Sequence, residues 1–154
     1  MHLFEENIKN LGLNIPELPK ALANYVPYKI VGKTMYISGQ APVQNGELIY
    51  KGKVGSDITI EDGIEAARLC VTNIIAAVKT GLECDWGKLD SFVKLTGFVN
   101  CQDDFTDQQK IINGASDMLV EIFGDQGRHA RVAVGSNALT LGISVEIDAI
   151  VQLK

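Results

Sequence analysis

Two stretches near the C-terminus, residues 129–134 and 143–151, constrain the fold more than any other feature of the chain, because both alternate like β-strands. Side chains at positions i and i+2 of a strand project to the same side of its sheet. Each stretch therefore has one apolar side and one that gathers ionisable groups, which are His129 and Arg131 in the first and Glu146 and Asp148 in the second. If the two strands pair, Arg131 and Glu146 share one face of a sheet.

The composition describes one globular domain. A chain of 154 residues, of which 46% are hydrophobic and 21% charged, is long enough to bury a core of its own. We expect a single domain over residues 1–154, in which residues 1–20 form a helical N-terminal extension. A net charge of −5 argues against general nucleic-acid binding, which needs a basic face to displace counterions from phosphates.

The cysteines and histidines favour neither a disulfide framework nor a metal site. Cys70, Cys84 and Cys101 form no CxxC pair, and two histidines are too few for a typical zinc site. The N-terminus has no basic segment followed by an apolar one, and no apolar run reaches the length of a membrane span. The sequence therefore favours a cytoplasmic protein with free thiols, without a metal and without membrane contact.

Hydrophobic periodicity predicts two long amphipathic helices. One opens at the capping sequence Thr59-Ile-Glu-Asp62 and ends near Gly81, and the other runs from Phe105 to Gly124. A short helix is expected over residues 3–11, and further strands over residues 25–31, 34–38, 48–50 and 92–99. This order predicts an α+β fold in which both long helices cover one face of a mixed sheet. The other face needs a cover, which symmetric assembly of several copies would provide.

Three short segments carry a more specific pattern: Ser38-Gly39-Gln40 after a strand, His129-Ala-Arg131, and Val145-Glu146-Ile-Asp148. In these segments and in its order of elements, the chain from about residue 24 to residue 154 resembles the RidA/YjgF family of reactive intermediate deaminases, also named L-PSP endoribonuclease-like. The spacing of Arg131 and Glu146 is also that of the family. The N-terminal extension is similar to that of a longer subgroup.

The resemblance implies a fold like that of the trimeric bacterial chorismate mutase, with the sheets of three copies forming a central barrel and the helices outside. It implies a homotrimer with three clefts between subunits, each binding the carboxylate of a small 2-imino or 2-keto acid. The reaction it implies is the hydrolytic deamination of enamine or 2-imino acid intermediates, for which no cofactor is needed.

By position, the resemblance gives Arg131 as the carboxylate-binding arginine and Glu146 as the residue that activates or orients the attacking water. Tyr25 matches a tyrosine that lines the cleft from the neighbouring subunit. Gly39 matches a loop glycine beside the substrate, where a missing side chain permits close backbone approach. Asn113, on the second long helix, matches a cleft asparagine.

Two positions beside Arg131 depart from the family pattern. His129 stands where a proline is common, and Ala133 stands where many members have a cysteine, so Ala133 can offer only a backbone contact. His129 either assists proton transfer at the rim of the cleft or is a structural residue. Arg131 and Glu146 have an alternative role as an ion pair buried between subunits, and Tyr25 as an ordinary strand residue.

Three functions remain open at this point. The first is the cofactor-free deaminase. The second is a trimeric protein that binds small carboxylate metabolites and performs no chemistry. The third is the ribonuclease or translation-inhibitor activity attached to some family names, which the acidic balance of the chain disfavours.

Overall fold

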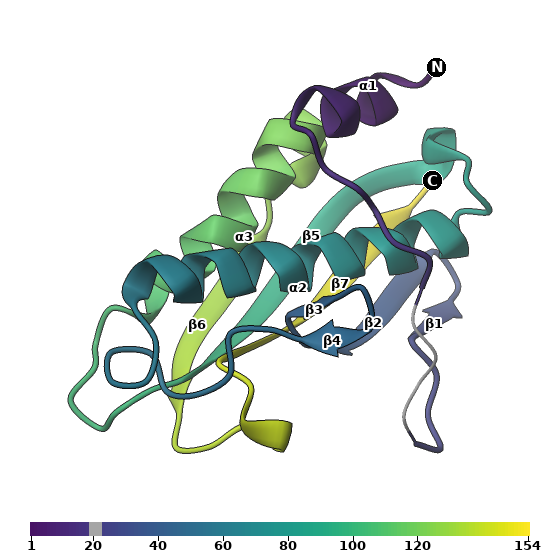
Figure 1. The fold of residues 1–154 in the computed structure, drawn as a ribbon. Helices are drawn as coiled ribbons and strands as arrows, with labels where there is room; N and C mark the ends of the chain where they lie inside the picture. The colour runs from purple at the N-terminus through teal and green to yellow at the C-terminus, as the bar shows by residue number, and fades with distance from the viewer. Residues whose placement is uncertain (19–22) are drawn as a thin grey trace.

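The computed structural model of the protein describes residues 1–18 and 23–154, so the last two residues of the predicted N-terminal extension lie outside the described part. A sheet forms one layer and two long helices form the other (Figure 1). The elements are, in order, α1 (Leu3–Asn10), β1 (Tyr28–Val31), β2 (Thr34–Gln40), β3 (Val43–Gln44), β4 (Glu47–Leu48), α2 (Ile60–Gly81), β5 (Leu89–Asn100), α3 (Gln108–Phe123), β6 (Ala130–Ser136) and β7 (Val145–Leu153). Short 3₁₀ helices span Trp86–Lys88, Gly124–Gly127 and Thr140–Gly142.

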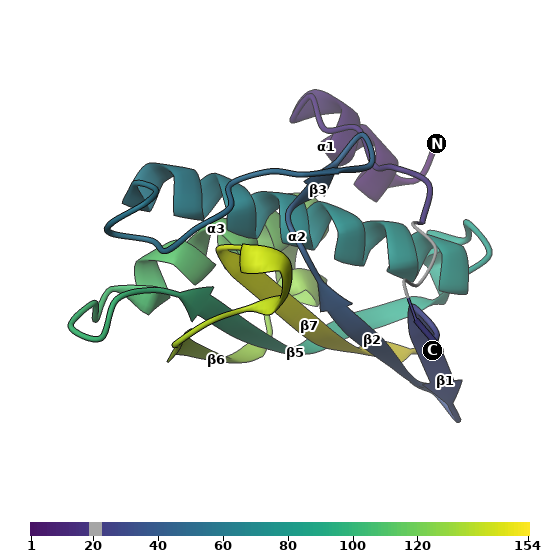
Figure 2. The ribbon, with the colours of Figure 1, turned by 60° about the horizontal axis from the view of Figure 1, so that its bottom comes forward.

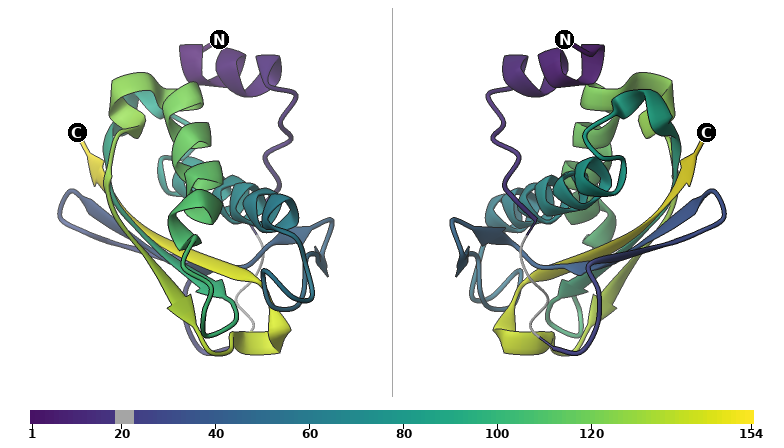
Figure 3. Two further views of the ribbon diagram at one scale, coloured as in Figure 1. Left: turned by 90° about the vertical axis from the view of Figure 1, so that its left-hand side faces the viewer. Right: turned by 90° about the vertical axis from the view of Figure 1, so that its right-hand side faces the viewer.

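The main sheet has five strands in the order β1-β2-β7-β5-β6, which Figure 2 shows from below the helices. Neighbouring strands are antiparallel except β5 and β6, which are parallel and are joined through α3. Parallel neighbours need such a crossover because both strands start at the same end of the sheet. Figure 3 shows α2 and α3 on one side, while no helix of the described residues covers the other. The predicted α+β fold, with two long helices on one face of a mixed sheet, is confirmed.

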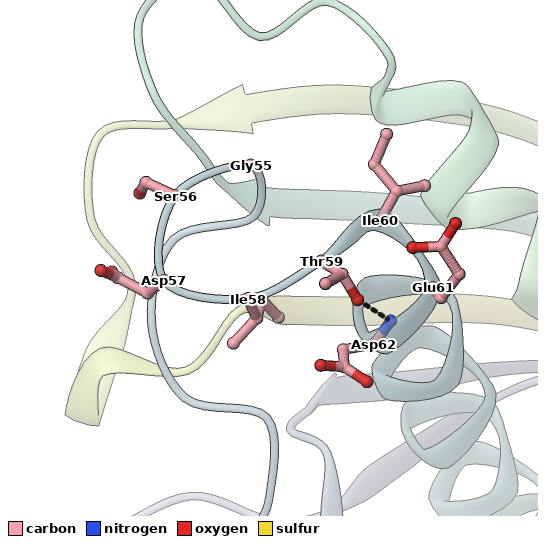
Figure 4. A pocket seen from close by; sticks show the side chains of 8 residues that line it. All are labelled: Gly55, Ser56, Asp57, Ile58, Thr59, Ile60, Glu61 and Asp62. Carbon is pink, nitrogen blue, oxygen red and sulfur yellow. Dashed lines mark hydrogen bonds between the residues drawn. The ribbon is translucent and has the colours of Figure 1, made fainter.

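Local signals set the ends of the long helices. Thr59 caps α2, because its Oγ1 accepts a hydrogen bond from the amide of Asp62 at 3.1 Å (Figure 4). α3 ends at Gly124, whose φ of 58° is one that glycine adopts without strain. The start of α3 was predicted at Phe105, three residues before its observed first residue, Gln108.

The inner sides of the two long helices fill the space above the sheet. Residues predicted for these sides are fully or almost fully buried: Ala67, Val71, Ile74, Val78 and Leu82 in and after α2, and Ile112, Ala115, Leu119 and Ile122 in α3. Only Ile64 of the predicted set is half-buried. Within residues 1–18 and 23–154, no helix combines the length and apolar character needed to span a bilayer.

β6 and β7 do not pair with each other, contrary to the expectation from the sequence. β5 runs between them, so that Leu95 of β5 is opposite Arg131 and Phe98 of β5 is opposite Glu146. Register partners project to the same side of a sheet, and residues three apart in a strand project to opposite sides. Arg131 therefore faces the helices and Glu146 projects from the other side, and the prediction that they share a face is wrong.

We call the side of the sheet away from the helices the open face. It carries Tyr36, Thr96, Phe98, Val132, Val134, Glu146, Asp148 and Ile150. Tyr36, Val132 and Val134 are 50%, 41% and 38% exposed, respectively. In β6 the apolar side thus lies on the open face, while the side with Arg131 and Ala133 turns toward α3.

The N-terminal helix α1 is part of the core. Phe4 is 5% exposed, and its ring meets those of Trp86 and Phe123 edge to face, with centroid distances of 6.1 and 4.9 Å. Glu5 pairs with Lys79 at 2.9 Å and accepts a hydrogen bond from Trp86 Nε1 at 2.7 Å. These contacts with Lys79 and Trp86 lower the pKa of Glu5.

Because its ring fills the centre of this aromatic cluster, Phe4→Ala should lower the free energy of unfolding by about 3–5 kcal/mol. Leu3→Ala, at a neighbouring residue that is 60% exposed, is the matched control and should change it by less than about 0.5 kcal/mol. Chemical denaturation of both variants measures the difference. Equal midpoints would show that α1 is not part of the cooperative core.

Candidate active site

The predicted site residues lie at two separate places on the sheet. Arg131, Ala133, Asn113 and His129 gather where β6 meets α3, together with Ser116, and we call this group the arginine half-site. Glu146, Gly39 and Tyr25 lie around β2 and β7, and we call this group the glutamate half-site. Each group is described in turn.

In the arginine half-site, Arg131 leans from the edge strand β6 over α3. Its Nη1 donates a hydrogen bond to Ser116 Oγ at 3.1 Å, and its Nη2 donates one to the carbonyl oxygen of Gln109 at 3.3 Å. Both acceptors are neutral. Among the ion pairs of residues 1–18 and 23–154, none involves Arg131. Its positive charge is therefore not neutralised within the described part of one chain.

Asn113 lies on α3 between Gln109 and Ser116, the two residues that accept hydrogen bonds from Arg131. The carbonyl of Gln109, which binds Arg131, is the one that accepts the amide of Asn113 in a regular helix. Asn113 is exposed and stands one turn before Ser116 on the same side of the helix. Asn113 therefore lies on the same side of α3 as the two groups that accept hydrogen bonds from Arg131.

His129 completes the arginine half-site. Its Nε2 is 2.9 Å from Ser116 Oγ, and its Nδ1 is 2.7 Å from the carbonyl oxygen of Gly127. Burial lowers the pKa of His129, and the charge of Arg131 lowers it further, while the contact with Gly127 acts in the opposite direction. A shallow hollow of about 340 Å³ opens here, lined by Ser116, Asp117, Val120, Arg128, His129 and Arg131.

Ser116 is the residue of this group that the sequence did not reveal. It touches both Arg131 and His129, yet a single serine within an amphipathic helix has no distinguishing pattern. Its place three residues after Asn113 was the one available signal. Ala133, two residues after Arg131 on the same side of β6, has no side chain beyond its methyl group to add to the site.

In the glutamate half-site, Glu146 projects from the open face against Gly39. A Cβ on Gly39 would lie 2.7 Å from Glu146 Oε1, so a side chain there would displace the Glu146 carboxyl group from this position. Gly39 was predicted in a loop, but it lies inside β2, where a shift in the pairing with β7 forms a bulge. Burial raises the pKa of Glu146, and the nearby Asp148 raises it further.

Tyr25, the third residue of this half-site, lies in the segment before β1, and not in the strand where it was predicted. It is 52% exposed. The two residues that follow it are tied to Ser38, the neighbour of Gly39: Ser38 Oγ donates to the carbonyl oxygen of Val26 at 2.6 Å, and the Ser38 amide donates to that of Pro27 at 2.9 Å.

One chain cannot bring the two half-sites together. Glu146 and Arg131 are separated by two strand spacings, about 10 Å, and project from opposite faces of the sheet. Tyr25 precedes β1, and β1 lies four strand spacings, about 19 Å, from β6. A ligand small enough to touch Arg131 in one copy could reach Glu146 only in another copy.

Other hollows do not involve the predicted residues. The one in Figure 4 surrounds the start of α2 and is lined by residues 55–62, none of which belongs to either half-site. Among the described residues, no three histidine, cysteine, aspartate or glutamate side chains lie together as a metal site would require. The candidate site therefore consists of the two half-sites.

Comparison with known proteins agrees with this fold and with the family that the sequence resembles. A family model described as "YjgF/chorismate mutase-like, putative endoribonuclease" matches residues 5–148. The chain belongs to the RidA/YjgF family. A protein of unknown function from Agrobacterium tumefaciens is 42% identical, and its crystal structure superimposes with a TM-score of 0.93 over 99% of this chain and 93% of that one.

Two further similar proteins extend the comparison. Protein TCP17 of Trypanosoma cruzi is 37% identical over 149 residues, which are 96% of this chain and 92% of TCP17. The crystal structure of Escherichia coli TdcF with bound serine is 25% identical, with a TM-score of 0.63 over 88% of this chain and 94% of TdcF. The Agrobacterium match covers almost the whole chain, including the N-terminal helix.

The raised pKa of Glu146 predicts a stability effect with a definite sign. Between pH 4.5, the ordinary value, and the raised pKa of Glu146, the folded protein binds more protons than the unfolded one. Protonation of Glu146 therefore contributes to the free energy of unfolding below pH 4.5, and this contribution is lost as the pH rises through the raised pKa. Glu146→Gln should therefore raise the free energy of unfolding at pH 7, by less than about 1 kcal/mol because the carboxyl group is half-exposed.

Denaturant titrations at pH 4 and pH 7 measure this effect, with Glu121→Gln on the exposed side of α3 as the control. The gain from Glu146→Gln should be present at pH 7 and nearly absent at pH 4. A gain of the same size at both pH values would contradict the assigned cause.

Proposed function

We propose that the protein is a cofactor-free hydrolase that deaminates short 2-imino acids and their enamine tautomers in clefts formed between copies of the chain. The observation that carries this proposal is the half-buried Arg131 guanidinium, which has only neutral acceptors within the described part of its own chain. A guanidinium has five N–H donors, and two are used here. The remaining three suffice for two parallel hydrogen bonds to a ligand carboxylate.

The family supplies a related ligand. TdcF of Escherichia coli has been crystallised with serine, a small molecule in which a carboxylate is attached to the carbon that bears nitrogen. A 2-imino acid has the same arrangement with a C=N bond at that carbon. Binding the carboxylate through a planar fork also fixes the position of the imine carbon, so the gain is largely one of orientation.

The separation of the half-sites supports a cleft shared by neighbouring copies. The arginine half-site lies at the β6 edge, and the glutamate half-site lies on the open face, which exposes Tyr36, Val132 and Val134. Burying this apolar surface against other copies would stabilise an assembly and would bring the β6 edge of one copy to the open face of the next. A homotrimer, as in the family, is the assembly we propose.

Glu146 would then act on the water. A carboxylate whose pKa is raised by burial is a stronger base, so Glu146 would accept a proton as the water oxygen bonds to the imine carbon. Glu146 would pass this proton to the imine nitrogen, which gives the carbinolamine, and would then carry the hydroxyl proton to the amino nitrogen as the C–N bond breaks, the carbonyl group forms and ammonia leaves. One water is consumed, and one 2-keto acid and one ammonia are formed, without any redox change.

A second function is favoured by a specific observation. The arginine half-site is complete in one chain and can bind a carboxylate without Glu146, so the protein could serve as a binding protein for small carboxylate metabolites. Nuclease activity is less well supported, because the open face carries Glu146 and Asp148 and the chain has a net charge of −5.

The test is ammonia release from an imine generated in situ. Arg131→Ala should lower kcat/KM at least about 100-fold because the substrate loses its charge-assisted hydrogen bonds, and Arg131→Lys should lie between this variant and the wild type. Arg68→Ala, an arginine of α2 paired with Glu65, is the matched control and should leave the rate unchanged.

Each other outcome has its own meaning. Binding of a keto acid without faster ammonia release would support the binding protein over the enzyme. Ammonia release by Arg131→Ala as fast as that by an active wild type would contradict the deaminase proposal, and equal keto-acid affinity of the two proteins would contradict the binding protein. RNA cleavage that survives Arg131→Ala would indicate a different site.

A further inference from the structure

Arg131 is held by a series of hydrogen bonds that leads back to the main chain. Its Nη1 is 3.1 Å from Ser116 Oγ, Ser116 Oγ is 2.9 Å from His129 Nε2, and His129 Nδ1 is 2.7 Å from the carbonyl oxygen of Gly127. Together with the bond from Arg131 Nη2 to the carbonyl oxygen of Gln109, the series ties the strand β6 to the helix α3. The series runs from the proposed ligand-binding group to a fixed backbone atom.

The directions of the two outer bonds follow from the groups at the ends of the series. A guanidinium can only donate and a carbonyl oxygen can only accept, so His129 Nδ1 must carry a proton. When the imidazole is neutral, Nε2 carries no proton and accepts a hydrogen bond from the Ser116 hydroxyl group. The Ser116 oxygen then accepts the hydrogen bond from Arg131, so all three bonds are made with a neutral imidazole.

The surroundings favour the neutral imidazole that this arrangement needs. Burial and the charge of Arg131 both lower the pKa of His129. The other charged side chains at the hollow, Asp117 on α3 and Arg128 before β6, have opposite signs, and Arg128 is paired with Asp125 at 3.3 Å. On β5, the neighbouring strand, Lys94 projects to the open face and away from the imidazole.

We propose that Ser116 and His129 are positioning residues that hold the Arg131 guanidinium in the orientation in which it binds the ligand carboxylate. This inference rests on the proposed function, since it takes Arg131 as the carboxylate-binding group. Ser116 and His129 act through Arg131 and touch no reacting atom.

Two physical reasons support this role. A free arginine side chain loses rotamer freedom when it binds, and a side chain that is already fixed loses less, so binding is tighter. Neutral acceptors also leave the charge of the guanidinium available, whereas a protein carboxylate at the same place would compete with the ligand. The serine hydroxyl fixes Arg131 without neutralising it.

The experiment measures both ligand affinity and kinetics. Ser116→Ala should weaken pyruvate binding, measured by calorimetry, and raise KM for the imine, each about ten-fold. It should change kcat by less than about two-fold, because Arg131 holds the carboxylate equally in the ground state and the transition state. Ser116→Thr, which keeps the hydroxyl group, should restore both values, and His129→Phe should behave like Ser116→Ala.

Thr80→Ala is the matched control, because it removes a helix hydroxyl whose hydrogen bond, 2.9 Å to the carbonyl oxygen of Ala76, stays within α2. It should leave pyruvate affinity unchanged. A lower thermal midpoint for Ser116→Ala with wild-type pyruvate affinity would overturn the positioning role and leave a merely structural contact. Failure of Ser116→Thr to restore binding would overturn it as well.

The outcomes separate this inference from the proposed function. If the wild type binds pyruvate in a manner that depends on Ser116 but releases no ammonia, the deaminase proposal fails and the positioning role stands. If ammonia release depends on Arg131 while Ser116→Ala matches the wild type, only the positioning role fails. If the wild type binds no pyruvate, both are overturned.

Discussion

The pairing of β5 with both C-terminal strands decides where the ionisable side chains of this protein point. Because β5 lies between β6 and β7, each ionisable residue projects to the same side of the sheet as its partner in β5. Arg131 is opposite Leu95, which is buried under the helices, and Glu146 is opposite Phe98, which faces away from them. The same pairing makes β6 an edge strand, with α3 beside it. The position of the arginine half-site, the exposed apolar residues of the open face and the separation of the two half-sites all follow from this arrangement.

The two half-sites offer opposite electrostatic conditions. Arg131 lies among neutral acceptors, so that its charge remains available for an anion. Glu146 is partly buried beside Asp148 and next to the backbone of Gly39, and both burial and the second carboxylate favour its protonated form. These are the two groups to which the proposed hydrolysis of a 2-imino acid assigns the binding of the carboxylate and the uptake of a proton. In one chain, Arg131 and Glu146 project from opposite faces of the sheet, so the sheet separates the two groups.

Local features of the sequence predicted local structure well. The cap at Thr59, the end of α3 at Gly124 and the alternation within each C-terminal strand are all present in the structure. The alternation in the sequence also correctly placed Arg131 and Ala133 on one side of β6 and Val132 and Val134 on the other. It did not show which of these two sides faces the helices, because the register with β5 depends on tertiary pairing. The usual rule that the apolar side is buried fails for β6, and Ser116 could not be singled out before α3 and β6 were placed together.

The account predicts that a working cleft takes Arg131 from one copy and Glu146 from another, and mixed oligomers test this most directly. Arg131→Ala and Glu146→Gln should each be inactive alone. Co-expressed in equal amounts and purified as mixed oligomers, they should regain about one quarter of the wild-type rate of ammonia release, since random assembly pairs an intact Arg131 with an intact Glu146 in that share of clefts. A mixture as inactive as its two parents would contradict the shared cleft.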